Sequence, residues 1–194
     1  MGLEPKTGIA HHGVTAIIKG GRPGPKIALR ADMDALPVAE RSGLPFASKA
    51  TAQYRGETVG VMHACGHDAH TGILLGVARA LVAMRNTLPG EVMLVFQPAE
   101  EGPPPGEDGG AQMMLAQGIF DDFKPEAVFG LHVFSTVQAG QIGVRGGPLM
   151  AASDRFSIKV IGRQTHGSTP WGGIDTIVAA ADLIGTAQTI LSRR

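Results

Sequence analysis

Eight consecutive residues, His63 to His70 (HACGHDAH), contain three histidines, an aspartate and the only cysteine of the chain. Thiolate, neutral imidazole and carboxylate are the side-chain groups that bind zinc and similar divalent metals. Gly66 lets the backbone turn tightly between Cys65 and His67, so both side chains can point towards one ion. A structural zinc finger is disfavoured, because it needs a second such pair and the sequence has none. The segment therefore predicts part of a catalytic metal site.

Two adjacent carboxylates, Glu100 and Glu101, follow an apolar segment. One of them could bind metal while the other acts as a general base on water. Adjacent residues of an extended segment point in opposite directions, which suits two separate roles. A solvated acidic loop is the alternative, since Glu107 and Asp108 follow closely.

Three more polar residues lie at the ends of apolar segments. Asp32 and Asp34 share one face if their strand continues, and one of them could hold the imidazole of a metal-bound histidine and fix its tautomer. The alternative for both is a solvated turn. His132 interrupts an apolar segment, where a histidine is usually a satisfied core residue. Here it is also the natural remaining metal ligand.

Hydrophobic patterning predicts the elements that position these residues. Strands are expected at 14–19 and 26–34, paired as a hairpin, and at 91–97, 126–133 and 141–147. Helices are expected at 69–85 and 111–120, and a loop at 38–61. The strand at 91–97 is nearly all apolar, which indicates that both of its faces are covered. Alternating strands and helices predict an α/β sandwich with ligands at the carboxyl ends of its strands.

The pattern changes after Gly147. Residues 153–163 alternate between apolar and polar, which predicts a half-exposed antiparallel strand, and residues 176–194 predict a helix. We place a domain boundary near Ala151, between an incomplete catalytic domain (1–151) and the start of a second domain (152–194). One strand and one helix are too little to bury a core alone.

Composition excludes several function classes. Seventeen basic residues balance seventeen acidic ones, which gives no electrostatic reason to expect nucleic acid or an anionic membrane as partner. No apolar segment is long enough to span a bilayer, and the first residues do not form a signal peptide. A single cysteine excludes an internal disulfide and predicts a cytoplasmic protein. The sequence has neither G-x-S-x-G nor a phosphate-binding loop.

Four segments, in order RADMDALP, MHACGHDAHTGILLG, FQPAEEG and GLHV, carry a family resemblance. They resemble the amidohydrolase family of hippurate hydrolases, aminoacylase-like N-acyl-amino-acid hydrolases and auxin-conjugate hydrolases, among the dinuclear-metal carboxypeptidases and aminoacylases. The resemblance implies a three-layer α/β/α catalytic domain with a mixed central sheet. It also implies the start of a small α+β, ferredoxin-like lid domain. The implied reaction is hydrolysis of the amide bond of N-acyl amino acids.

The resemblance also implies roles for individual residues. Two divalent metals, with zinc expected and manganese, cobalt or nickel as alternatives, would have four ligands here: Cys65, His67, Glu101 and His132. Glu100 would be the general base that later protonates the leaving amine, and Asp34 the acid that orients the metal site. His166 would match a lid histidine that reaches the active site of the partner subunit, so a homodimer formed through the lid is expected.

The sequence departs from the family pattern in three ways. The chain is shorter than family members and stops inside the lid, so we expect the carboxyl-terminal histidine ligand to be missing. Trp171 stands where many relatives have histidine, and Thr176 where many have proline. Two alternatives therefore stay open: a metallo-dipeptidase or carboxypeptidase, and a non-catalytic metal-binding fragment of such an enzyme.

Overall fold

The computed structural model describes residues 1–104, 106–151 and 156–192. The chain divides into two compact units, Met1–Ile142 and Gly143–Arg194. The domain boundary expected near residue 151 lies inside the second unit and stays a prediction.

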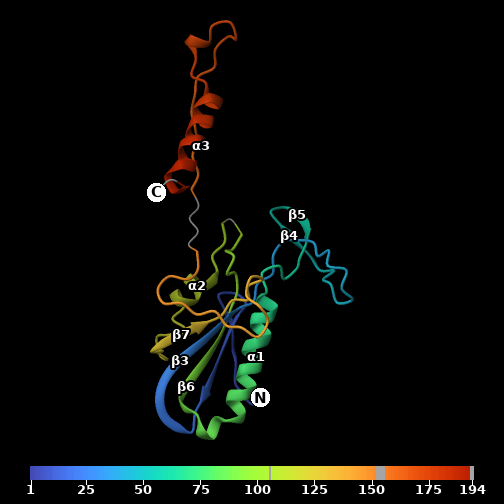
Figure 1. Ribbon diagram of the computed structural model, residues 1–194, viewed down its shortest axis with the longest axis vertical. Coiled ribbons are helices and arrows are strands. Elements are labelled where there is room, and N and C mark those ends of the chain that lie inside the picture. The colour runs from blue at the N-terminus through green and yellow to red at the C-terminus, as the bar shows by residue number, and fades with distance from the viewer. Residues whose placement is uncertain (105, 152–155, 193–194) are drawn as a thin grey trace. The chain divides into compact units, whose positions relative to one another are not determined.

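The first unit is built on a five-stranded mixed sheet with the order β1-β2-β6-β3-β7 (Figure 1). Its strands are β1 (Lys6–Ile9), β2 (Gly13–Lys19), β3 (Arg22–Asp32), β6 (Pro89–Gln97) and β7 (Ala127–Gly130). Strand β6 is antiparallel to β2 and parallel to β3, and β7 is parallel to β3. Helices α1 (His67–Ala83) and α2 (Gly110–Ala116) pack on opposite faces. The predicted three-layer α/β/α architecture is confirmed.

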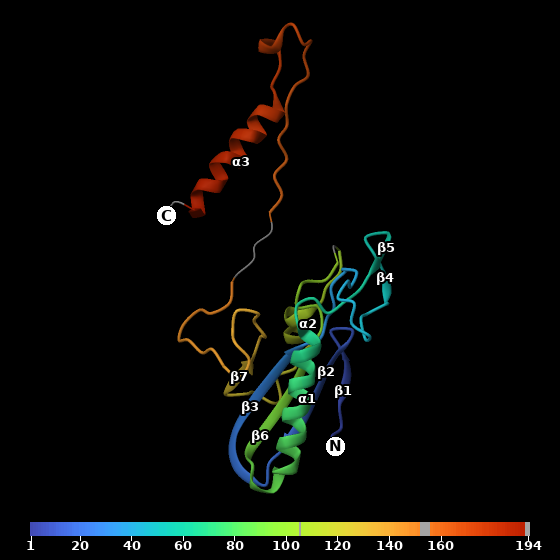
Figure 2. The same cartoon turned by 45° about the vertical axis from the view of Figure 1, so that its right-hand side comes forward.

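The core lies on both faces of β6. Val92, Leu94 and Phe96 pack in the cluster that holds Leu74 of α1, which runs along this face of the sheet (Figure 2). Met93 and Val95 point the other way, into the cluster that holds Met114 of α2. Because successive side chains of a strand alternate between faces, a central strand covered twice must be apolar throughout. The prediction for 91–97 is therefore confirmed.

The predicted hairpin between the second and third strands is wrong. Strand β6 lies between them, so that Ile18 of β2 and Ile27 of β3 both pair with Val92. The turn that joins β2 to β3 passes the start of β6 at close range. Gly20 donates to the carbonyl of Gly90 (2.9 Å), and Gly21 to that of Arg85 in the short 3-10 helix η1 (Arg85–Thr87; 2.8 Å). These long-range contacts leave no local signal in the sequence.

Two other local predictions are wrong. The segment 38–61, expected as a loop, contains the antiparallel pair β4 (Thr51–Tyr54) and β5 (Glu57–Gly60). Arg55 and Gly56 join them with φ of 54° and 82°, as hairpin turns of two residues require. Residues 141–147, expected as a strand, do not form one.

The second unit contains the 3-10 helix η2 (Pro170–Gly172) and helix α3 (Thr176–Ser192). Of the strand expected at 153–163, residues 153–155 lie outside the described residues. Residues 156–163 form no strand, and only an isolated bridge joins Arg163 to Ile174. A strand needs a hydrogen-bonded neighbour, and the described part of this unit offers only that bridge. In the described parts of the chain, no helix has the length and apolar character that crossing a bilayer requires.

Candidate metal centre

Three parallel strands and one helix deliver the predicted site residues to one edge of the sheet. Asp34 follows the end of β3, Glu100 follows β6 and His132 follows β7, while α1 begins at His67. Parallel strands place their carboxyl ends at the same edge, which explains the convergence. Six predicted site residues meet at this edge, and each lies close to at least one of the others: Asp34, Cys65, His67, Glu100, Glu101 and His132.

His67 is completely buried and has a defined tautomer. Its Nδ1 lies 2.9 Å from the backbone carbonyl oxygen of Asp34, which can only accept, so Nδ1 carries the hydrogen. The lone pair therefore belongs to Nε2, which is buried and has no hydrogen-bond partner among the described residues. A buried acceptor without a partner is costly. A metal ion at Nε2 would satisfy it, with the carbonyl orienting the ring from behind.

His132 shows the same arrangement. Its Nδ1 donates to the carbonyl of Val133 (2.6 Å), and its Nε2 faces Cys65 Sγ at 3.3 Å. Ligand atoms of Cys65, His67 and His132 all lie within 4.8 Å of one another. Sulfur with two imidazole nitrogens is a donor set that suits zinc, so these residues fit a bound metal.

The Cys65 thiol is strongly disfavoured as a thiolate in the metal-free chain. Burial, a hydrogen bond with Glu101 and the negative charges of Glu101 and Glu100 raise its pKa to about 11. A divalent cation in this cluster would reverse the balance, because it favours the thiolate as a ligand and offsets the carboxylates.

Glu100 and Glu101 form a second donor group with His67, again within 4.8 Å. Glu100 Oε2 lies 3.9 Å from His67 Nε2, and its side chain is 40% exposed, so water can reach it. The backbone N–H of Glu101 donates to Asp34 Oδ2 (3.1 Å), and this bond holds the backbone of Glu101 beside Asp34. Just before this pair, Ala99 has φ of 48°, an unusual conformation for a residue with a Cβ. No sequence pattern marks this turn.

Gly66 is the residue whose conformation holds Cys65 and His67 together. Its φ is 85°, and a Cβ there would lie 2.4 Å from Val133 Cγ2. We expect Gly66→Ala to lower the free energy of unfolding by about 1–3 kcal/mol, since it adds backbone strain and a clash. Urea unfolding monitored by circular dichroism measures the change.

Gly72, inside the helix that follows Gly66, supplies the control. A Cβ there meets no described atom within 4 Å. Gly72→Ala should therefore raise the stability by about 0.5–1 kcal/mol, as alanine does in a helix interior. Equal effects of both substitutions would contradict a special role for Gly66.

The two aspartates left open by the sequence have different partners. Asp34 contacts His67 through its carbonyl, and its Oδ1 lies 3.2 Å from His67 Nδ1. Asp32 is buried and hydrogen-bonded to His70. Sequence reasoning gave His70 no role, because its partners lie far away along the chain.

His166 belongs to the second unit and is exposed. Its Nδ1 accepts the backbone N–H of Ser168 at 3.2 Å and lies 2.8 Å from the Ser168 hydroxyl. The ring hydrogen is therefore on Nε2, which is left available to donate.

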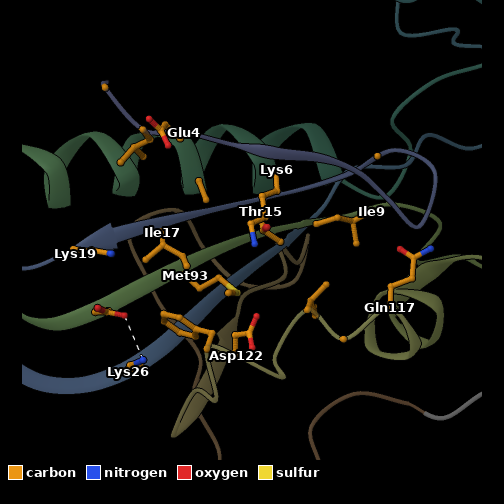
Figure 3. Close-up of a pocket in the computed structure, with 18 of the residues that line it drawn as sticks. Glu4, Lys6, Ile9, Thr15, Ile17, Lys19, Lys26, Met93, Gln117 and Asp122 are labelled. Carbon is orange, nitrogen blue, oxygen red and sulfur yellow. Dashed lines mark ion pairs between the residues drawn. The ribbon is translucent and has the colours of Figure 1, made fainter.

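Two hollows of similar size lie on the first unit. One, of about 900 Å³, adjoins the metal centre and is lined by Asp34, Glu101, Leu36 and Val61, among others. The other, of about 850 Å³, is lined by residues that include Lys6, Ile17, Met93 and Asp122 (Figure 3). The residues described around the second hollow include none of the predicted site residues.

A mixed β-sheet with sulfur, nitrogen and oxygen donors at the carboxyl ends of its strands is an arrangement that suits a metal-dependent enzyme. Residues 28–190 match the sequence model of Peptidase family M20/M25/M40, and the chain belongs to this family.

Similar curated proteins and a similar solved structure agree with this family assignment. The chain is 43% identical over 192 residues (99% of it, 42% of the relative) to N-acetyl-L-cysteine deacetylase of Bacillus subtilis. It is 43% identical over 180 residues (93% and 45%) to N-acyl-L-amino acid amidohydrolase of Geobacillus stearothermophilus. A solved Bacillus subtilis structure described as a dinuclear metal-binding peptidase of family M20 is 42% identical, with a TM-score of 0.64 over 76% of this chain and 37% of that one. The chain thus spans less than half the length of these curated relatives.

Proposed function

We propose that the protein is a metal-dependent amidohydrolase that cleaves the amide bond of N-acyl amino acids. The observation that carries the proposal is His67 Nε2, a buried acceptor without a partner among the described residues, in a residue that belongs to both the Cys65 and the Glu101 donor groups. The substrate class is supported by the names of the two curated relatives, a deacetylase of N-acetyl-L-cysteine and an N-acyl-L-amino acid amidohydrolase.

In this proposal two divalent cations, zinc in the first place and manganese, cobalt or nickel as alternatives, have the ligands Cys65, His67, Glu101 and His132. The metals would polarise the substrate carbonyl and make water acidic enough for a base to deprotonate it for the attack. Support comes from the mixed donor set and from the dinuclear relative. His67 belongs to both donor groups, but the single lone pair of its Nε2 can bind only one ion, so water or substrate would have to complete the coordination of the two ions.

Glu100 is the proposed general base, and it returns the proton to the leaving amine. Its carboxylate is accessible and lies beside His67, whereas Glu101 contacts Cys65. Asp34 is the proposed orienting acid. It holds the His67 ring through its carbonyl and the Glu101 backbone through its carboxylate.

We further propose that residues from 152 onwards begin a lid domain through which two copies of the protein dimerise. Helix α3 exposes apolar side chains, among them Ile177, Val178 and Ile184, that a partner would cover. His166, with Nε2–H free to donate, is the proposed group that steadies the reacting carbonyl oxygen in the partner subunit's site. The proposed location is the cytoplasm, because a Cys65 ligand must stay reduced.

A matched pair of substrates tests the function. N-acetyl-L-alanine and glycyl-L-alanine differ only by the ammonium group of the glycyl residue, and chromatography separates the released alanine from both substrates. We expect the zinc-loaded chain to hydrolyse N-acetyl-L-alanine faster than glycyl-L-alanine. A chelator should abolish the activity. Preference for glycyl-L-alanine would instead indicate a dipeptidase. Failure to hydrolyse either would indicate a non-catalytic metal-binding fragment.

A further inference from the structure

A line of hydrogen bonds runs beside the metal centre and begins at Asp32. This last residue of β3 is buried, and each of its carboxylate oxygens has one close partner. Arg30 Nη1 lies 2.7 Å from Oδ2, and His70 Nδ1 lies 2.6 Å from Oδ1. Burial raises the pKa of Asp32, but the His70 hydrogen bond and the Arg30 charge outweigh it and lower the pKa below its usual 3.8. Asp32 is therefore an ionised carboxylate, and each of its two oxygens accepts a hydrogen bond.

His70 continues the line. It is buried, and its Nε2 lies 2.9 Å from the backbone nitrogen of Val133. A peptide N–H can only donate, so Nε2 is the acceptor and Nδ1–H is the donor to Asp32. Both ring nitrogens are thus engaged. Asp32, His67 and His70 are close enough to hold a metal, but both oxygens of Asp32 and both ring nitrogens of His70 are already engaged, so only His67 Nε2 is available in this group.

Val133 connects this line to a proposed ligand. Its N–H donates to His70, while its carbonyl accepts from Nδ1 of His132. The rings of His70 and His132 also meet edge to face, with centroids 4.7 Å apart and planes at 66°. Strand β7 has already ended at Gly130, so its pairing with β3 no longer holds the chain at Val133.

We propose that His70 is a positioning residue: it anchors the Val133 peptide to α1 and Asp32, and thereby keeps His132 Nε2 directed at Cys65 Sγ. This inference rests on the proposed function, because it gives His132 the task of a ligand. The hydrogen bond that carries it is the one from Val133 to His70 Nε2, and the bond to Asp32 only sets the tautomer.

Two amide substitutions separate these bonds. The amide of His70→Asn reaches the position of Nδ1 and can keep the bond to Asp32, but it cannot accept from Val133. The amide oxygen of His70→Gln reaches the position of Nε2 and can accept from Val133. If anchoring Val133 is what matters, glutamine restores function and asparagine does not. If satisfying the buried Asp32 is what matters, the order is reversed.

Cobalt(II) is the probe, because its absorption reports the bond to the Cys65 thiolate. We expect the cobalt dissociation constant, measured by competition with a chelator, to rise about 10–100-fold in His70→Asn and His70→Ala, as for other residues that support metal ligands. In His70→Gln it should stay within about threefold of wild type. His63→Asn, the same change at an exposed histidine of the same segment, should leave it unaltered.

Amide hydrogen exchange of Val133 in the metal-free chain gives a second readout. Exchange should be at least tenfold faster in the asparagine and alanine variants than in wild type or the glutamine variant. A wild-type chain that binds no cobalt would refute the proposed metal centre, while the exchange rates would still test the anchor. Equal exchange rates in all variants, or asparagine rescuing cobalt binding better than glutamine, would overturn the role of His70.

Discussion

Replacing Glu100 by glutamine is expected to lower kcat for an N-acyl amino acid by about 10²–10⁴-fold, the usual contribution of a general base. Glutamine keeps the size of the side chain but cannot accept a proton. Because Glu100 lies 3.9 Å from His67 and is not among the four proposed ligands, the metal content should not change. Initial rates, with plasma mass spectrometry on the same samples, measure both quantities.

Two neighbouring glutamates serve as comparisons, because each substitution is expected to have a different effect from Glu100→Gln. Glu101→Gln should reduce the metal content as well as the rate, because Glu101 is a proposed ligand. Glu107→Gln, in the same acidic loop and exposed, should change neither. A Glu100→Gln chain that loses its metal would make Glu100 a ligand instead, and one with normal kcat would show that the base lies elsewhere.

Removing the Cys65 thiol is expected to have the second large effect. Cys65 Sγ faces His132 Nε2 and belongs to the donor group that also contains His67. We expect about two zinc ions per wild-type chain after reconstitution, and an affinity more than about 100-fold weaker in Cys65→Ala, since direct ligands contribute more than their supporting residues. Competition with a zinc chelator measures the difference.

The control for Cys65 is His63→Ala. His63 lies two positions away but is exposed and belongs to none of the donor groups found among the described residues. Its removal should leave zinc binding unchanged. If Cys65→Ala binds zinc as tightly as wild type, the thiol is not a ligand, and nitrogen and oxygen donors alone hold the metal.

Local sequence patterns were sufficient to predict an element where its own apolar side chains show that it is buried. The apolar run at 91–97 identified β6 as a central strand, and the long apolar segment after His67 identified α1. The pattern failed where pairing decides structure. Residues 156–163 alternate like a strand but have no strand partner among the described residues, whereas the polar pair β4 and β5 forms because a two-residue turn closes it.

The sequence by itself determined the donor types, their grouping near strand ends and the family to which the chain belongs. Those properties reside in residue identity and short spacing, which do not depend on how distant segments meet. Only the tertiary structure decided that β6 enters between β2 and β3, that His67 contacts Asp34 through the backbone carbonyl, and that His70 joins Asp32 to Val133. Each of these rests on hydrogen bonds between residues far apart in the chain, whose geometry is fixed by sheet order and helix placement.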